Sequence, residues 1–281
     1  MYFDGVLVDL DSSGNGLGQW AGRVYIEKNL GTAGQAAFPS LIQDAPTIWT
    51  EDHRQRGRAG VYIRLGFNEQ LFPNGQPNIT FDVKGKKVFD PRDGAQSQGD
   101  SSTWTYSSNA ALVHADYITD SNFGFSSQYT SEVNQVALIA AANVCDEDVT
   151  LADASTENRY ECHTVFETSE DRHNLMEQFC GAYAGWCTDT GGQFLIFPGA
   201  YRTPSTPTLT IDDMLSPISI RRLASVREFP NGCKGTFISP DHNWQWTDFP
   251  PVLGTAYLAS DGERRWKDIK LPCTTSSPMA Q

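Results

Sequence analysis

Apolar and charged residues alternate along two stretches near the start of the chain, residues 24–31 and 60–67. Because successive side chains of a strand point to opposite faces, this period of two predicts half-buried β-strands. Between them, residues 33–46 carry a short helical spacing that Pro46 should end. Residues 79–90 are typical of a strand, a glycine turn and a second strand. The first part of the chain is therefore expected to be β-rich with one short helix.

Helical spacing dominates the middle of the chain. Apolar residues recur every three or four positions over residues 109–119, 131–143 and 171–188, which predicts three helices with buried faces. The last begins after a run of capping and acidic residues, and a glycine pair at 191–192 is expected to end it and turn into a strand over 193–198. Helices and strands in this order favour an α/β arrangement for this region.

The last part of the chain alternates between connectors and short strands. A Pro- and Thr-rich connector begins at residue 201, and a single helical turn is expected over 211–215. A strand is predicted over 218–229, and residues 257–272 are expected to form two strands around an Asp-Gly turn. This region should return to β-structure.

Residues 93–103 are polar and rich in glycine and serine, and their apolar residues show no regular spacing. This composition predicts a linker. Together with the chain length of 281 residues, it predicts several compact units. We expect an α+β, multi-domain protein with a β-rich domain over 1–98, an α/β domain over 99–204 and a β-rich segment over 205–281.

The most distinctive stretch is residues 231–252, NGCKGTFISPDHNWQWTDFPPV. A short apolar strand should stop at Pro240, whose ring removes a backbone donor. The residues after it combine large aromatic area with a backbone that proline keeps from being helical. We predict a docking or core-plugging loop, whose candidate interface residues are Trp244, Trp246, Phe249, Pro250 and Pro251. Packing within the chain and contact with another subunit both remain open for this loop.

Charge narrows the classes of function. The formal net charge is −13, and the isoelectric point lies near 4.7, which disfavours tight phosphate binding because nucleic-acid affinity comes largely from basic groups. An acidic wall past which DNA slides remains compatible with this charge. No window approaches the roughly 18 consecutive apolar residues of a membrane span. The acidic start of the chain lacks the basic region of an export signal, so synthesis in a cytoplasm is expected.

Candidate reactive groups do not assemble into a known pattern. The five histidines lie on different predicted elements, and no Gly-x-Ser-x-Gly motif is present. The six cysteines lack metal-ligand spacing, and most are expected to be small buried apolar residues. Residues 9–20 resemble a calcium loop, but Trp20 stands where a bidentate glutamate belongs. The acidic loop at 145–153 also has carboxylates that could hold a cation, but we expect it to be a solvated loop. We therefore expect no catalytic, cofactor or metal site and no enzyme activity.

Several stretches, including residues 231–252, resemble phage tail-tip hub proteins of the tip attachment (host specificity) protein J family. The resemblance covers most of the chain and follows the family's order. It is carried by LFPNGQPNITFDVKGKKVFDPRDG (71–94), SNAALVHADYITDSNFGF (108–125), AANVCDEDV (141–149), YECHTVFETSEDRHNLMEQFCGAYAG (160–185), GGQFLIFPGAYRTP (191–204) and LTIDDML (209–215).

The resemblance implies a homotrimeric hub at the distal end of a phage tail, in the virion. Such hubs are built from small β-sheet or β-barrel-like domains with an α/β insertion. They close the tail tube, contact other tail-tip proteins and the tape-measure protein, and open to let DNA pass the lumen without specific binding. In such proteins further polypeptide follows this region and contacts the host receptor, so we expect this chain to be the hub-domain portion of a longer protein or an unusually short one.

Two other classes of function remain open from the sequence. A tail-associated enzyme that degrades cell wall would need a pocket with a perturbed carboxylate or a Cys–His pair. A receptor-binding module in its own right would bind susceptible cells as an isolated fragment.

Overall fold

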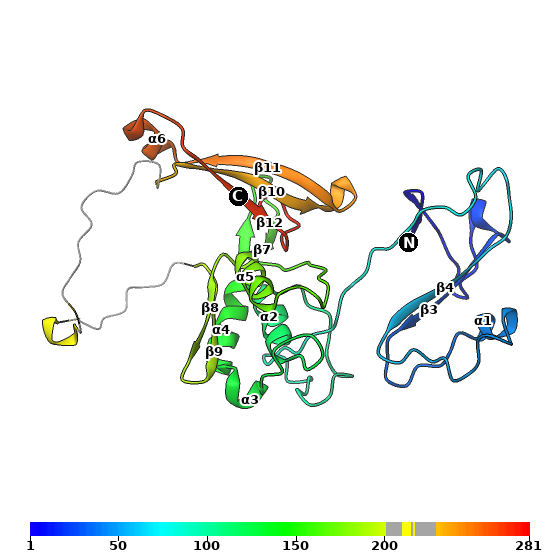
Figure 1. Ribbon diagram of the computed structural model, residues 1–281. Helices are drawn as coiled ribbons and strands as arrows, with labels where there is room; N and C mark the ends of the chain where they lie inside the picture. Colours follow the sequence, from blue (N-terminus) through cyan, green and yellow to red (C-terminus); the bar gives the residue numbers. More distant parts are fainter. Residues whose placement is uncertain (201–209, 215, 217–228) are drawn as a thin grey trace. The chain divides into compact units, whose positions relative to one another are not determined.

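The computed structural model describes residues 1–200, 210–214, 216 and 229–281. The chain divides into two compact units, Met1–Lys84 and Gly85–Gln281 (Figure 1). The predicted division at residues 98 and 204 stays a prediction. The connector expected from residue 201 lies outside the described residues, as does the strand expected over 218–229 except for Phe229.

The first unit contains two small antiparallel sheets. β3 (Val24–Leu30) pairs with β4 (Ala59–Leu65) along their full lengths, in the two stretches where alternation predicts strands. The second sheet has the order β2-β1-β5 and joins β1 (Tyr2–Phe3) to β2 (Val6–Leu7) and β5 (Ile79–Thr80). The helix expected within 33–46 is α1 (Pro39–Asp44), and the one-turn 3-10 helix η1 spans Gly18–Trp20. The second strand expected within 79–90 does not form.

A small aromatic core holds the first unit together. Phe3 and Trp20 are buried and meet edge to face, with ring centroids 5.4 Å apart. Phe72 stacks on Trp20 from the loop before β5. Val24 and Ile26 supply the buried face of β3. The alternation seen in the sequence thus places one face of β3 in this core.

The core of the second unit is helical. α2 (Ala110–Thr119) is buried on almost every side, packing against α4 (Gln135–Cys145) and α5 (Arg172–Ala182) (Figure 1). Asn109 caps α2 by accepting the backbone N–H groups of Ala111 and Leu112, and its side-chain amide donates to the carbonyl of Ala142 in α4. This buried cap ties the start of α2 to α4.

The helix expected over 131–143 is broken. Residues 131–132 belong to the one-turn α3 (Tyr129–Glu132), and α4 begins only at Gln135. Between them Val133 forms a parallel bridge with Phe194, and the Asn134 backbone N–H donates to the Phe194 carbonyl. The Asn134 side chain then caps α4 by accepting the Ala137 N–H. Tertiary pairing and a cap therefore interrupt the apolar period.

The helix expected over 171–188 ends early, which corrects the prediction. α5 stops at Ala182, because Ala184 adopts a left-handed φ of 49° and Gly185 approaches the Phe197 carbonyl so closely that a Cβ would lie 2.0 Å from its oxygen. Residues 186–190 instead form β8 (Trp186–Thr190), paired with β9 (Gln193–Phe197). The glycine pair at 191–192 makes the two-residue hairpin turn, with φ of 64° and 79°.

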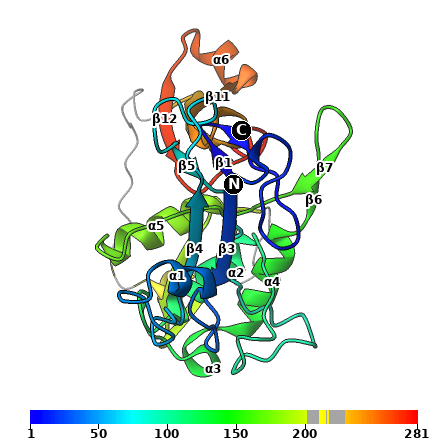
Figure 2. The same cartoon turned by 90° about the vertical axis from the view of Figure 1, so that its right-hand side faces the viewer.

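The remaining strands of the second unit form a hairpin and a three-stranded sheet. β6 (Asp148–Thr150) pairs with β7 (Thr156–Asn158) in a short hairpin (Figure 2). β10 (Gly232–Ser239) lies between the antiparallel β11 (Gln245–Leu253) and the parallel β12 (Trp266–Leu271). The first of the two strands expected within 257–272 is instead α6 (Thr255–Asp261), which Gly262 ends at φ 71°.

Two 3-10 turns, η2 (Ile211–Asp213) and η4 (Pro240–His242), complete the described elements. The α+β class is confirmed, because both units combine helices with small separate sheets. Within the described ranges these sheets remain open, so the barrel-like form expected of the β-rich parts is not observed there. Among the helices in the described part of the chain, none is long and apolar enough to cross a membrane.

Candidate functional site

The aromatic run forms an ordered hairpin, which corrects the prediction of a loop. β10 ends at Ser239, immediately before Pro240 as expected, and η4 makes the turn. β11 then runs back from Gln245, and Ser239 pairs with Gln245 across the turn. Four of the five candidate interface residues, all except Trp244, therefore belong to a strand.

A bulge accommodates the two prolines in this strand. Gly235 pairs with Phe249 and Cys233 pairs with Val252, so Pro250 and Pro251 together lie opposite the single residue between Cys233 and Gly235. Proline has no backbone N–H and is tolerated at bulges and on outer strands. Among the described strands, β11 is an outer strand of the sheet. These prolines keep the stretch from being helical, and the bulge lets it continue as a strand.

The five candidate residues differ in exposure. Phe249 is buried, with 3% of its surface exposed, whereas Trp244 and Trp246 are 49% and 43% exposed. Pro250 and Pro251 are exposed. Packing within the chain therefore accounts for Phe249, and the two tryptophans leave large apolar area on the surface.

Trp244 lies in an unusual backbone conformation. Asn243 and Trp244 have consecutive left-handed φ values of 54° and 58°. Asparagine tolerates this region, but a bulky residue such as tryptophan is disfavoured there by roughly 1–2 kcal/mol. The Trp244 backbone N–H donates to the Ser239 carbonyl at 2.9 Å, which closes the turn. The turn thus presents an indole at a position where glycine would be less strained.

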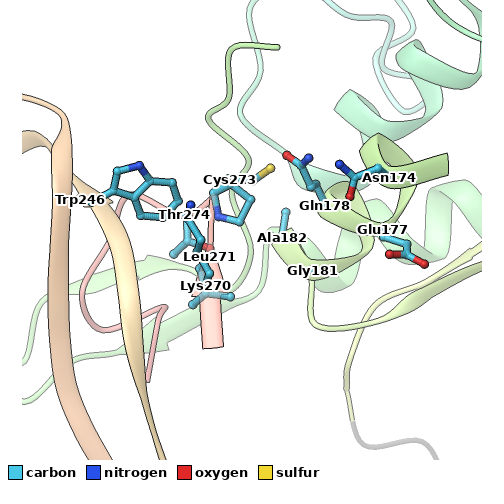
Figure 3. Close-up of a pocket in the computed structure, with 11 residues that line it drawn as sticks. Asn174, Glu177, Gln178, Gly181, Ala182, Trp246, Lys270, Leu271, Cys273 and Thr274 are labelled. Atoms are coloured by element: carbon cyan, nitrogen blue, oxygen red, sulfur yellow. The ribbon is translucent and has the colours of Figure 1, made fainter. Parts of the chain in front are cut away.

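Trp246 lines a cleft of about 430 Å³ between the sheet and α5 (Figure 3). The ammonium group of Lys270 lies 4.2 Å from the centre of the Trp246 ring, close enough for a cation–π interaction. Leu271, the last residue of β12, continues this wall, followed by Pro272, Cys273 and Thr274.

The opposite wall is one face of α5. Asn174, Glu177, Gln178 and Gly181 line the cleft at the spacing of successive helical turns. Leu175 and Phe179 lie on the other face and are buried in the core. The apolar spacing of the sequence predicted only the buried face of this helix. The polar face was missed, although residues 174, 177 and 181 recur at helical spacing.

The histidines do not form a reactive group with the cysteines among the described residues. His114 is fully buried in α2, where its Nδ1 lies 2.9 Å from the Tyr183 hydroxyl and its ring stacks on Phe179. Burial lowers the pKa of His114 to about 3, so the ring is neutral at physiological pH. His163, next in sequence to Cys162, directs its Nε2 toward the Glu161 carboxylate at 3.3 Å. These contacts fit packing roles.

The two segments weighed as cation loops use their carboxylates internally. Asp11 accepts the backbone N–H groups of Ser13 and Asn15, which defines a turn. In the acidic loop after α4, Asp146 pairs with Arg92 at 2.7 Å and Glu147 pairs with Arg159 at 2.9 Å. Over the described residues no cluster of three potential metal ligands is found.

Two buried cysteines meet at the junction of the core and the C-terminal segment. The backbone N–H of His163 donates to the carbonyl of Cys273 at 2.9 Å, so the two segments lie side by side. Both side chains are buried, and the interaction between the two thiols raises the pKa of Cys162 and lowers the pKa of Cys273. No sequence signal predicts this pair, because the residues are far apart in the chain.

Comparison with known proteins supports the resemblance to the class of phage tail-tip proteins. Over 223 aligned residues the chain is 25% identical to a curated protein of that class. This relative is "Tip attachment protein J" of Escherichia phage SECphi27, and the alignment covers 76% of the present chain. The chain spans only 18% of the relative's length. No protein-family model matches the chain.

Proposed function

We propose that the chain is a structural part of a phage tail tip, within the central tail hub that closes the tail tube and takes part in host attachment and DNA ejection. The similarity to a tip attachment protein over 76% of the chain is the observation that carries this proposal. The corresponding location is the distal end of the tail in the virion.

The surface of the second unit supports an assembly role. Trp244 is half-exposed at the tip of the β10–β11 hairpin, held there by a turn whose backbone is strained. Aromatic anchors of this kind dominate the energetics of protein interfaces. We assign Trp244 to contact between copies in a homotrimer or to contact with other tail-tip proteins, including the tape-measure protein. The net charge of −13 suits a lumen that DNA passes without specific binding.

The proposed role is not enzymatic. His114 is neutral and enclosed by aromatic side chains. We assign no receptor contact to the residues of this chain.

The test measures the mass of the purified chain in solution by light scattering at increasing concentration. The proposal expects a trimer that Trp244→Ala converts into folded monomers, with Trp186→Ala as the control, because Trp186 is 59% exposed on a different hairpin. A wild-type chain that stays monomeric at high concentration and with added tail-tip proteins would contradict the proposal. Release of peptidoglycan fragments by the chain would favour the enzyme instead.

A further inference from the structure

The cleft lies between α5 and the part of the sheet that carries Trp246 of β11 and Lys270 of β12. It has the size and lining of a ligand site. Its volume of about 430 Å³ lies within the range of roughly 300–1,000 Å³ typical of small-molecule pockets. One wall is a rigid aromatic residue on a strand, and the other is the polar face of a capped helix (Figure 3). Both walls belong to the second unit.

The charges in the lining balance. Lys270 supplies one positive charge and Glu177 supplies one negative charge, and the other lining side chains are uncharged. Such a site gives no strong electrostatic preference for an anion or a cation, since the two charges offset each other at a distance. A neutral ligand is therefore favoured.

The polar groups of the lining can both donate and accept. Within the described residues, the side chains of Asn174 and Gln178 make no hydrogen bond, although each carries an acceptor oxygen and a donor amide. The Glu177 carboxylate adds acceptors and the Lys270 ammonium adds donors. Hydroxyl groups also donate and accept, so a ligand rich in hydroxyls matches this set.

The aromatic wall adds an apolar platform. Lys270 lies over one face of the Trp246 indole, which helps to fix the ring, while 43% of the residue remains exposed. A sugar ring carries C–H groups on its faces and hydroxyls around its edge. Its face can pack on an indole while its edge bonds to amides and carboxylates.

We infer that this cleft binds a neutral oligosaccharide, stacked on Trp246 and hydrogen bonded by Asn174, Glu177 and Gln178 of α5. This function goes beyond the proposed assembly role, which uses Trp244 at the hairpin tip. Gly181 keeps the cleft open, because nothing lies within 4 Å of the position that a Cβ would occupy.

The experiment follows the indole N–H signals of the full chain by NMR during titration with maltopentaose, cellopentaose or chitopentaose, each to about 10 mM. Substitution Trp246→Phe identifies the Trp246 signal. At least one sugar is expected to shift that signal saturably, while the signal of Trp266, which lies outside the cleft, stays in place.

A matched pair of variants tests the location. Gly181→Leu should fill the cleft and raise the dissociation constant at least about tenfold, whereas Gly181→Ala should change it less than about twofold. Both replacements favour the helix, so the fold should be retained, as circular dichroism would verify.

Three results would overturn the inference: no shift with any of the three sugars, unchanged affinity in Gly181→Leu, or a response to the dipeptide Lys-Glu in place of the sugars. The mass of Gly181→Leu in solution separates the two proposals. If Gly181→Leu loses sugar binding but stays trimeric, the cleft is separate from the assembly surface. If the wild-type chain is monomeric and still binds sugar, the assembly proposal fails and the sugar site stands.

Discussion

The buried His114 should make the second unit less stable as the pH falls. Its pKa is about 3 in the folded chain and 6.5 for the unperturbed side chain, because burial disfavours the charged ring. Below pH 6.5 the unfolded chain takes up a proton that the folded chain does not. A group with a lowered folded pKa contributes stability that is fully present above the unfolded pKa and is lost as the pH falls toward the folded pKa.

The magnitude follows from the size of the shift. Each pH unit between the two pKa values corresponds to about 1.4 kcal/mol. His114 alone should therefore lower the free energy of unfolding by about 2 kcal/mol between pH 7 and pH 5. At pH 3, where half of the folded rings also carry the proton, the loss reaches about 4 kcal/mol.

Hydrogen exchange at the buried amides of α2 measures this effect within the second unit. The comparison is with His114→Gln, which removes the titrating ring but keeps an acceptor for the Tyr183 hydroxyl. Carboxylates titrate in both proteins, so the difference between their pH profiles isolates His114. An equal loss of stability between pH 7 and pH 5 in the two proteins would refute the reasoning, as would an NMR titration showing His114 protonated at pH 5.

Three further predictions concern the sheet and its junction with the core. Trp244→Gly should be more stable to denaturant than Trp244→Ala by about 1 kcal/mol, because glycine adopts the left-handed φ without strain; equal midpoints would contradict it. Gly235→Ala should lose about 2 kcal/mol or more of unfolding free energy, because the new Cβ would lie 1.7 Å from the Ile269 carbonyl oxygen; an unfolding curve like that of the wild type would disprove this. A small disulfide reagent should oxidise Cys162 and Cys273 to a disulfide, since the two buried thiols interact; peptide mapping that finds both thiols free after complete reaction of the partly exposed Cys180, Cys187 and Cys233 and prolonged incubation would count against it.

Local patterns predicted those elements whose formation depends mainly on local residues. The alternation in β3 and β4 reflects one buried face, and both strands formed where expected. α2 also formed in the expected segment, because Asn109 provides its cap and the apolar residues that follow are buried. In these elements, local preference and tertiary packing favour the same structure.

The errors arose where distant residues decide the backbone. α5 ends early because Gly185 closely approaches the carbonyl of Phe197 in β9. The residues of the helix alone do not indicate this contact with a distant strand. α4 starts late because Val133 and Asn134 bond to Phe194. Apolar spacing cannot predict such contacts, since it records only which side of an element is buried.

The candidate site was predicted in part. The sequence singled out its aromatic residues, and the structure separates them into buried Phe249, the tip residue Trp244 and the cleft residue Trp246. Lys270 was missed because its partner Trp246 lies across the sheet on another strand. The polar residues of α5 recur at helical spacing, so the sequence did indicate a polar face on this helix.

The two adjacent prolines of β11 limit how copies of the protein can join. An outer strand normally offers a row of backbone N–H and carbonyl groups to which a neighbouring chain can add a strand. At Pro250 and Pro251 the N–H groups are missing and the strand bulges, so this border is a poor template for a continuous intermolecular sheet. Copies that met at this border would be held by their side chains, and an assembly formed in this way would separate without unravelling a shared backbone ladder.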